Sequence, residues 1–463
     1  MNCNISIFNK IIFSVFATIF FCSCANIIPP SGGLKDTLAP VLVAAFPKDS
    51  TLNFSAKKIV LTFDEYIEIK EIQQNVVMNP LPKSQPEIDS KLHNVIVSLK
   101  DSLEPNTTYT INFGNAIKDV NEGNIAKNKT YIFSTGKTID NNIITGNVIV
   151  AKNGKIDSTL IAVLHNNLSD TAIIKIKPKY LVKLDGKGNF KFTNLPKATF
   201  NLFILPNDYS KKYDDSTKLF AFLSTPITTT DSITNFNLLA YREEEIIEKI
   251  TQQKQEDGKT KIIEKLRITT SLANNKYDVL DTALILSFNK KIRLKNIDSI
   301  ILVDTNYIKI KGAKVEFDSI NNVIIIKNNF ELNTKYIVVV GKTTVADTLE
   351  NILSKADTTR FTTLNETDYG NIKIRCNTKN DNAVLQIVSN GKLYMSLPIT
   401  TNIISKKLFK PGDYELRILI DENKNGVWDT GNYKQKKQPE KVIALNTKLL
   451  VKANWDNEVE IAW

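Results

Sequence analysis

The sequence has very few of the residues that build metal centres and nucleophilic catalytic sites. It contains two histidines and four cysteines among 463 residues. His93 and His165 each stand alone among residues typical of strands, so they cannot form a histidine-based triad or a multi-histidine metal site. Asp64 and Glu65 are adjacent carboxylates directly after a predicted strand, where they point to opposite faces rather than pairing for acid–base work. We therefore predict no catalytic residue and no enzymatic activity.

The sequence also lacks a concentrated basic stripe. The formal net charge is +11, but the lysine pairs at Lys57-Lys58, Lys211-Lys212 and Lys290-Lys291 are spread along the chain. Proteins that bind nucleic acid gather such residues on one helix or one face. The pattern argues against nucleic acid as a partner and leaves a mild attraction to anionic lipid or polysaccharide.

One long apolar run is present, and it lies at the N-terminus. Lys10 precedes a hydrophobic stretch from Ile11 to Phe21, which is shorter than the roughly twenty apolar residues that cross a bilayer. Phe21-Cys22-Ser23-Cys24 follows. This segment resembles the lipobox of bacterial lipoprotein signal peptides, which implies cleavage after residue 23 and acylation of Cys24. An ordinary secretory peptide with an incidental cysteine is the alternative.

The residues after Cys24 favour one compartment. Residues 24–36 include Pro29-Pro30-Ser31-Gly32-Gly33, the composition of a flexible tether. The resemblance implies an outer-membrane lipoprotein, because no aspartate follows Cys24. It also favours the periplasmic face over the cell surface, because surface-exported lipoproteins of the Bacteroidetes usually carry acidic residues there. After cleavage only Cys24 and Cys376 remain, and Cys376 is expected to be a small buried side chain of a strand.

Two segments of the chain repeat each other. The run from Ile59 to Ile67 is echoed from Leu284 to Ile292, and L-E-P-N-T-T-Y from Leu103 is echoed by F-E-L-N-T-K-Y from Phe330. Short strands with alternating apolar positions, separated by Asn, Asp, Gly and Pro, predict antiparallel sandwiches. The Asn and Thr of the second motif are expected to bond the loop backbone before a buried Tyr. These motifs resemble the bacterial Ig-like domain of S-layer type, expected over residues 37–138 and, more divergent, over 268–366.

A second module follows each of these segments. D-G-K-G-N-F-K-F from Asp185 and the later Phe200-Asn201-Leu202 resemble the carboxypeptidase regulatory-like, prealbumin-type sandwich, expected over residues 139–240. A degenerate copy is expected over residues 367–463, where F-K-P-G-D-Y from Phe409 repeats the spacing. The charged segment 241–267 is a linker, for which a strand pair around Asp257-Gly258 is favoured over a helix.

This order predicts an all-β fold of tandem β-sandwiches, Ig-like and prealbumin-like, each type present twice. With the signal peptide of residues 1–23, it resembles the Ig-like-domain lipoproteins of the Bacteroidetes. The resemblance implies a non-enzymatic, membrane-anchored scaffold of the cell envelope whose partner is an envelope protein or a polysaccharide. The alternative is a carbohydrate-binding accessory lipoprotein, which would present an exposed aromatic platform around Trp428 or Tyr433.

One loop has the composition of a calcium site. D-E-N-K-N-G-V-W-D offers oxygens at positions 1, 3, 5, 7 and 9 with glycine at 6, so the candidate ligands are Asp421, Asn423, Asn425, the Val427 carbonyl and Asp429. Position 12 is Asn432 instead of glutamate, and no helices are predicted beside the loop, which argues against an EF-hand. A metal-free turn is the other reading, because Asn and Gly tolerate left-handed conformations. Calcium is the only cofactor that the sequence suggests.

Short acidic triplets recur along the chain. Asp followed by Ser or Thr and an apolar residue begins at Asp36, Asp101, Asp170, Asp231, Asp298 and Asp318. The triplets resemble the O-glycosylation motif of exported Bacteroidetes proteins. Asp and Ser are also common turn formers, so both readings stay open.

Overall fold

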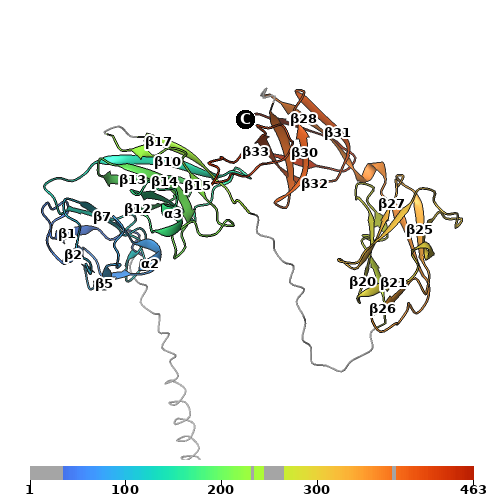
Figure 1. Ribbon diagram of the computed structural model, residues 1–463, viewed down its shortest axis with the longest axis horizontal. Coiled ribbons are helices and arrows are strands. Elements are labelled where there is room, and N and C mark those ends of the chain that lie inside the picture. Colours follow the sequence, from blue (N-terminus) through green and yellow to red (C-terminus); the bar gives the residue numbers. More distant parts are fainter. Residues whose placement is uncertain (1–34, 231–233, 245–264, 378–381) are drawn as a thin grey trace, which may run out of the picture. The chain divides into compact units, whose positions relative to one another are not determined.

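The computed structural model describes residues 35–230, 234–244, 265–377 and 382–463 (Figure 1). The predicted signal peptide, Cys24, most of the tether and the predicted strand pair at Asp257-Gly258 lie outside the described residues. The chain divides into two compact units, Met1–Asn142 with Asn194–Lys197 and Ile143–Thr193 with Ala198–Trp463. The first unit holds one Ig-like sandwich, and the second holds the remaining three sandwiches.

The first Ig-like sandwich has two antiparallel sheets and a short strand pair. One sheet has the order β1 (Leu42–Phe46), β2 (Lys58–Phe63), β6 (Asn94–Ser98), β5 (Glu87–Lys91). The other has the order β4 (Val77–Asn79), β7 (Thr108–Asn112), β9 (Thr130–Ser134), while β3 (Ile67–Ile69) pairs with β8 (Ile117–Asp119) and α2 (Ile72–Asn75) connects β3 to β4. Alternate residues of β2 are buried against Ile111 and Phe133 of the opposite sheet, which is the period of two expected of a half-buried strand.

The second Ig-like sandwich repeats this plan. Its sheets have the orders β18 (Ile268–Thr270), β20 (Leu284–Phe288), β24 (Val323–Lys327), β23 (Lys314–Asp318), and β19 (Lys276–Tyr277), β27 (Asp357–Thr363), β25 (Lys335–Val340), β22 (Ile300–Val303). β21 (Ile292–Leu294) pairs with β26 (Val345–Asp347), and η1 (Ile297–Ser299) and η2 (Glu366–Asp368) are short helical turns. β20 and β21 hold the places of β2 and β3, so the predicted equivalence of Ile59 to Ile67 with Leu284 to Ile292 is confirmed.

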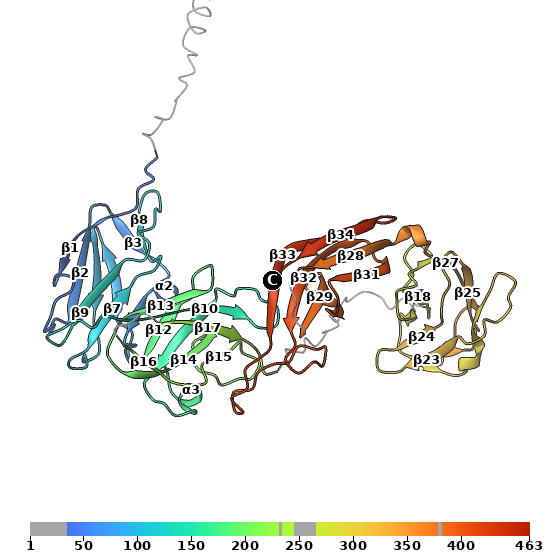
Figure 2. The same ribbon diagram turned by 90° about the horizontal axis from the view of Figure 1, so that it is seen from above.

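The other two sandwiches share a different plan, in which the first strand pairs in parallel with the last. In one of them, the first sheet has the order β13 (Asn189–Leu195), β10 (Asn142–Val150), β17 (Thr234–Ala240). Its second sheet has the order β12 (Tyr180–Lys183), β11 (Leu160–His165), β14 (Thr199–Pro206), β15 (Ala221–Phe222). The short strand β16 (Ile227–Thr228) also pairs with β14, and the helix α3 (Ala172–Lys175) lies between β11 and β12 in the chain. In the other, the sheets are β31 (Ile403–Phe409), β28 (Gly370–Cys376), β34 (Asp456–Ile461) and β30 (Lys392–Pro398), β29 (Ala383–Ser389), β32 (Gly412–Ile420), β33 (Lys441–Val451) (Figure 2). The predicted fold class, tandem β-sandwiches of two types each present twice, is confirmed.

The N-T-x-Y motif closes the same turn in both Ig-like sandwiches. The Thr107 hydroxyl donates to the Pro105 carbonyl at 2.9 Å, and the Tyr109 hydroxyl accepts the Glu104 N–H at 2.8 Å. The second copy has the same two bonds, Thr334 to Leu332 at 2.8 Å and Glu331 to Tyr336 at 3.2 Å. The asparagines act through the backbone, since Asn106 and Asn333 have φ values of 47° and 49°. Asn tolerates this left-handed conformation better than most residues, which explains its place in the motif.

A buried aspartate closes a second turn in each Ig-like sandwich. In the second copy, Asp347 is 1% exposed; it accepts bonds from the Asn351 side-chain amide at 2.9 Å, from backbone N–H groups including that of Leu349 at 2.9 Å, and from the Lys290 ammonium at 3.2 Å. The Asn351 amide, with those N–H groups and the ammonium, lowers the pKa of Asp347 to about 2. A carboxyl whose pKa is depressed by folding stabilises the fold above its unfolded pKa of about 4 and loses that contribution as the pH falls.

We predict that the second Ig-like sandwich is destabilised between about pH 4 and pH 2 by protonation of Asp347. Thermal unfolding followed at stepped pH should show a steeper loss of stability in the wild-type protein than in Asp347→Asn, which is less stable at neutral pH and cannot titrate there. Asp298→Asn replaces an exposed carboxylate outside this turn and serves as the control. Parallel pH profiles for wild type and Asp347→Asn would contradict the assignment.

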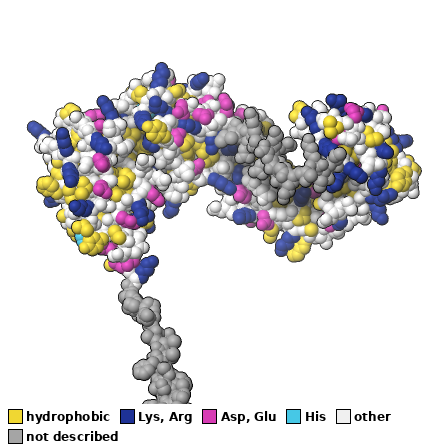
Figure 3. Space-filling view, turned by 90° about the horizontal axis from the view of Figure 1, so that it is seen from below, with side chains coloured by type: hydrophobic (Ala, Val, Ile, Leu, Met, Phe, Trp, Pro, Cys, Tyr) yellow, Lys and Arg dark blue, Asp and Glu magenta, His cyan; other side chains and the backbone are white. Residues whose placement is uncertain are grey.

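Figure 3 shows lysine and arginine side chains scattered over the visible face and no continuous stripe. This distribution agrees with the spacing of the lysine pairs in the sequence. In the part of the chain that the structure describes, no helix is long and apolar enough to cross a bilayer.

Candidate functional site

The Asp421 loop leaves β32 of the fourth sandwich and folds around one buried carboxylate. Asp421 is 2% exposed and accepts the Gly426 N–H at 2.7 Å and the Asn425 N–H at 3.2 Å. Lys424 and Gly426 have φ values of 62° and 78°, so the chain turns twice through left-handed conformations. The local sequence explains this shape, because Gly takes positive φ without strain and each Asn can bond the backbone two residues ahead.

A second buried carboxylate completes the loop. Glu440 is 6% exposed, and its two oxygens accept the N–H groups of Glu422 and Asp429, each at 2.9 Å. Asp429 in turn accepts the side-chain amides of Asn423 and of Asn425, the latter at 3.2 Å. The sequence analysis missed Glu440. No motif spacing marks it, because it lies at the far end of the loop, beside β33.

All five predicted calcium ligands belong to one small loop. The Asp421 carboxylate accepts the backbone N–H of Asn425, and the side-chain amides of Asn423 and Asn425 donate to Asp429. The fifth candidate is the Val427 carbonyl, and the N–H of the same residue donates to the Asn425 side chain at 2.7 Å. Within the described ranges, no group of three or more His, Cys, Asp or Glu side chains is arranged to hold a metal ion. The oxygens of the loop here accept N–H groups, so calcium would have to displace the amide contacts to Asp429. Calcium binding stays a prediction.

The two aromatic residues near this loop do not form an exposed platform. The Trp428 ring is half-buried against Val384, Leu419 and Val442, and its indole N–H donates to the Glu440 carbonyl at 2.8 Å. Tyr433 is 4% exposed. The prediction of an exposed aromatic platform for carbohydrate binding is therefore wrong at Tyr433, because its ring is buried by packing within the chain.

Tyr433 instead inserts into an aromatic cluster of the second sandwich, which belongs to the same compact unit. Its ring lies 5.1 Å from the rings of Phe220 and Phe222 and 5.9 Å from that of Phe203, in edge-on geometry. Its backbone N–H donates to the Glu243 carboxylate at 2.7 Å, and its hydroxyl donates to the Asp170 carbonyl at 3.0 Å. Both the apolar and the polar parts of Tyr433 are thus satisfied by a domain that lies far away in sequence. We call Phe203, Tyr213, Phe220, Phe222 and Tyr241 the aromatic socket, and residues Thr430 to Val442 the docking loop.

The rest of the docking loop adds polar and steric contacts. The Thr430 hydroxyl donates to the Arg242 carbonyl at 2.6 Å, and Lys436 pairs with the Asp170 carboxylate at 2.5 Å while covering the Tyr433 ring at 4.1 Å. A Cβ added at Gly431 would meet the Tyr241 ring at 2.6 Å, so only glycine fits there. At the end of the loop, the Val442 N–H donates to the Ala151 carbonyl at 2.9 Å. These contacts join the second and fourth sandwiches.

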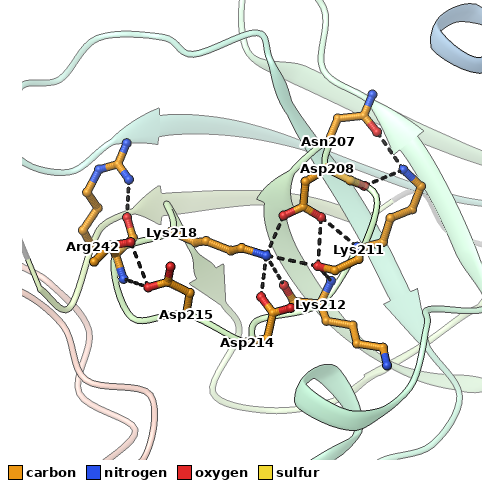
Figure 4. A network of polar contacts seen from close by, with 10 residues as sticks. Asn207, Asp208, Lys211, Lys212, Asp214, Asp215, Lys218 and Arg242 are labelled. Carbon is orange, nitrogen blue, oxygen red and sulfur yellow. Dashed lines mark hydrogen bonds and ion pairs between the residues drawn. The ribbon is translucent and has the colours of Figure 1, made fainter. Parts of the chain in front are cut away.

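The corresponding loop of the second sandwich holds its own cation (Figure 4). The Lys218 ammonium contacts Asp208 at 2.5 Å, Asp214, and the Ser210 hydroxyl at 3.0 Å. Burial disfavours the charged form of Lys218, but the bonds and charges of the two aspartates outweigh burial and raise its pKa. The ammonium lies between the two carboxylates and offsets part of their negative charge.

The remaining residues singled out in the sequence have structural roles. Cys376 is buried in β28, as predicted. His165 is buried beside Phe203, and burial lowers its pKa to about 4. The His93 ring lies against the Tyr66 ring in a tilted arrangement, with the ring centroids 4.4 Å apart. Asp64 accepts the Val41 N–H at 2.7 Å, so it ties the start of β1 to the end of β2. Among the residues of the acidic triplets, Thr37, Ser102, Thr171 and Ser319 are exposed, Ser299 is partly buried and Ser232 lies outside the described residues.

Comparison with known proteins supports the sandwich class. A model of the bacterial Ig-like domain family matches residues 36–135 and 263–363, so the chain contains two bacterial Ig-like domains. No curated protein sequence matches the chain. Similar solved structures include the major pilin subunit BcpA of Bacillus cereus, at 10% identity and a TM-score of 0.18 over 70% of this chain and 99% of that chain. The Bacillus anthracis TIE protein (12% identity, TM-score 0.17, 94% and 76%) and the N-terminal part of the bacterial S-layer protein SbsC (14%, 0.17, 44% and 44%) are further examples.

We predict that Tyr433→Ala opens the contact between the second and fourth sandwiches. Truncating a buried aromatic side chain costs about 3 to 5 kcal/mol, and here it also removes the hydroxyl bond to Asp170. Protease susceptibility within Thr430 to Val442 should rise, and the unfolding midpoint should fall. Tyr209→Ala, at a ring that is 92% exposed, is the matched control and should change neither.

We predict that calcium, if it binds the Asp421 loop, does so with a dissociation constant on the order of 10⁻⁴ to 10⁻³ M, because two carboxylates make a weak site. At about 100 times that constant, calcium would stabilise the folded protein by roughly 2.7 kcal/mol. The melting temperature of the full chain should then rise with calcium and stop responding in Asp421→Ala. No response in the wild-type protein at several times the upper constant would leave the loop as a metal-free turn.

Proposed function

We propose that the protein is a non-enzymatic, lipid-anchored scaffold of the bacterial cell envelope. The observation that carries this proposal is the docking loop. The chain devotes a buried tyrosine, a glycine without room for a side chain and several charged groups to fixing one sandwich against another. Two bacterial Ig-like domains within an all-β chain agree with this reading. A protein whose most elaborate contacts hold domains together is suited to presenting surfaces.

The polar groups of a cleft in the first sandwich support the same proposal. A cleft of about 360 Å³ in the first sandwich is lined by Pro80, Pro82, Pro86, Asp101 and Tyr109, among others. Asp101 accepts the Ser84 N–H at 2.6 Å, which lowers the pKa of the carboxyl, and the Tyr109 hydroxyl accepts the Glu104 N–H. The Asp101 carboxylate and the Tyr109 hydroxyl of the cleft thus bind backbone groups of nearby loops. An envelope protein or a polysaccharide remains the proposed partner, with the scaffold favoured over carbohydrate binding because Tyr433 is buried.

The anchor in this proposal is an acylated Cys24. Its support is the Phe21-Cys22-Ser23-Cys24 pattern after a short apolar run and the Pro- and Gly-rich residues that follow. The outer membrane, on its periplasmic face, is the proposed location. Several acyl chains bind a bilayer far more firmly than one.

We predict that Cys24→Ala releases the protein from the membrane fraction. Mass spectrometry of the wild-type protein should find a diacylated or triacylated cysteine at its N-terminus. Cys22→Ala is the matched control, since it removes a cysteine of the same segment and leaves Cys24 in place. Persistent membrane association of Cys24→Ala would overturn the anchor.

A further inference from the structure

One end of the first Ig-like sandwich exposes a set of large apolar side chains, which we call the apolar end. Its members and their exposed fractions are Leu38 (71%), Val41 (53%), Val43 (61%), Tyr66 (52%), Leu92 (62%) and Val120 (54%). Single exposed apolar residues are common on protein surfaces, but a contiguous group marks a contact site.

Backbone bonds show that several of these residues are close together. The Asp64 N–H donates to the Val41 carbonyl at 3.1 Å, the Ile67 N–H to the Leu92 carbonyl at 3.0 Å, and the Val120 N–H to the Tyr66 carbonyl at 3.0 Å. The three loops therefore meet around β3 and β8. Figure 2 shows β3 and β8 beside the point where the described chain begins, and Figure 3 shows hydrophobic side chains on the same part of the sandwich.

The second Ig-like sandwich shows that the fold does not require this apolar surface. Val41 precedes Leu42, which pairs with Phe63, and Arg267 precedes Ile268, which pairs with Phe288. By the same correspondence Tyr66 is matched by Lys291, just before β21, and Val120 by Thr348, just after β26. All three matching residues are exposed. At these three positions the copy nearer to the N-terminus has apolar side chains where the other has cationic or polar ones. The hairpin position of Leu92 is apolar in both copies, since Ile320 is exposed in the second.

We propose that the apolar end lies against the lipid surface to which the chain is anchored. This inference rests on the proposed acylation of Cys24. The sequence predicts a flexible tether between residues 24 and 35. A chain of that length and type has a root-mean-square length of roughly 18 Å, which would keep the start of the first sandwich within reach of the headgroups. Tyr66 suits such a position, because its ring is apolar and its hydroxyl can stay in water. Partial insertion of several apolar side chains fixes the orientation of this sandwich, which a flexible tether cannot do.

The charged groups beside the apolar end indicate which lipid headgroups it can face. Burial, and then the carboxylates of Asp36, Asp64, Asp119 and Glu122, raise the pKa of Glu65. This group of acids would be repelled by an anionic surface. A bilayer of zwitterionic lipid, whose headgroups end in an ammonium, fits the apolar end better.

The test uses the full-length acylated protein in phosphatidylcholine vesicles that carry a lipid-borne fluorescence quencher. Leu92→Cys and Ile320→Cys are labelled separately with the same fluorophore; Ile320 is 92% exposed at the tip of the corresponding hairpin of the second Ig-like sandwich, and Cys376 is buried. We expect quenching of the Leu92 label to be several-fold stronger than that of the Ile320 label. Adding anionic lipid should weaken it.

A triple variant gives the apolar end the residues of the second Ig-like sandwich. Val41→Arg, Tyr66→Lys and Val120→Thr together should reduce quenching of the Leu92 label to that of the Ile320 label while leaving the melting temperature and acylation unchanged. Val427→Arg, at a residue of the fourth sandwich that is 64% exposed, is the control and should leave quenching as in the parent.

The outcomes separate this inference from the proposed function. A protein with intact Cys24 that does not enter the vesicle fraction would overturn the anchor itself. A vesicle-bound protein with equal quenching at Leu92 and Ile320 would overturn only the apposition of the apolar end. Stronger quenching with anionic lipid would overturn the assignment of a zwitterionic surface.

Discussion

The insertion of Tyr433 into the aromatic socket is the contact on which the arrangement of the second unit depends. The tyrosine and its partner Glu243 are separated by 190 residues. In the unfolded, flexible chain, closing a loop of that length costs about 5 kcal/mol in chain entropy, before a length-independent constant. A buried aromatic side chain worth about 3 to 5 kcal/mol, with aromatic pairs at roughly 0.5 to 1.5 kcal/mol each, is of the right size to offset that cost. The polar contacts of Lys436 and Thr430 then fix the orientation of the loop.

The two copies of each sandwich type share a strand plan but stabilise the charged groups of their loops in different ways. In the second Ig-like sandwich the Lys290 ammonium faces Asp347, whereas in the first the corresponding position is Glu65, near Asp119. In the second sandwich the Lys218 ammonium contacts both Asp208 and Asp214, whereas in the fourth the Asp421 loop uses N–H groups and asparagine amides. The backbone bonds of Asp119 and Asp421 show why the fold is stable both with and without a lysine beside the carboxylate. Several N–H donors aimed at one carboxylate stabilise its charge without a counter-ion.

The sequence predicted what depends on local pattern and missed what depends on distant residues. Alternation in β2 and β20, the turn chemistry of N-T-x-Y and the burial of Cys376 are encoded within a few residues, so period and motif were sufficient. Tyr433 has an unremarkable local sequence, and its burial comes from phenylalanines more than 200 residues earlier. The role of Glu440 could not be predicted from the sequence either, because its partners are backbone N–H groups, which almost every residue has. The reading of the Asp421 loop as a calcium site depends on a competition between metal and N–H groups that residue spacing does not reveal.

The docking loop also covers part of an exposed sheet edge, where tandem sandwiches are prone to pair with other chains. A strand at the edge of a sheet presents unpaired N–H and carbonyl groups that can recruit another chain. β33 lies at the edge of its sheet, and the Val442 N–H at its start donates to Ala151 of the second sandwich. Gly154 lies so close to β33 that a Cβ there would meet the Ala444 nitrogen at 2.5 Å, and Lys155 pairs with Glu415 of the adjacent β32 at 2.9 Å. The same contact therefore positions the fourth sandwich against the second and covers one end of the exposed edge of β33. A substitution that opens the contact would loosen the two sandwiches. It would also expose β33 for pairing with a second molecule.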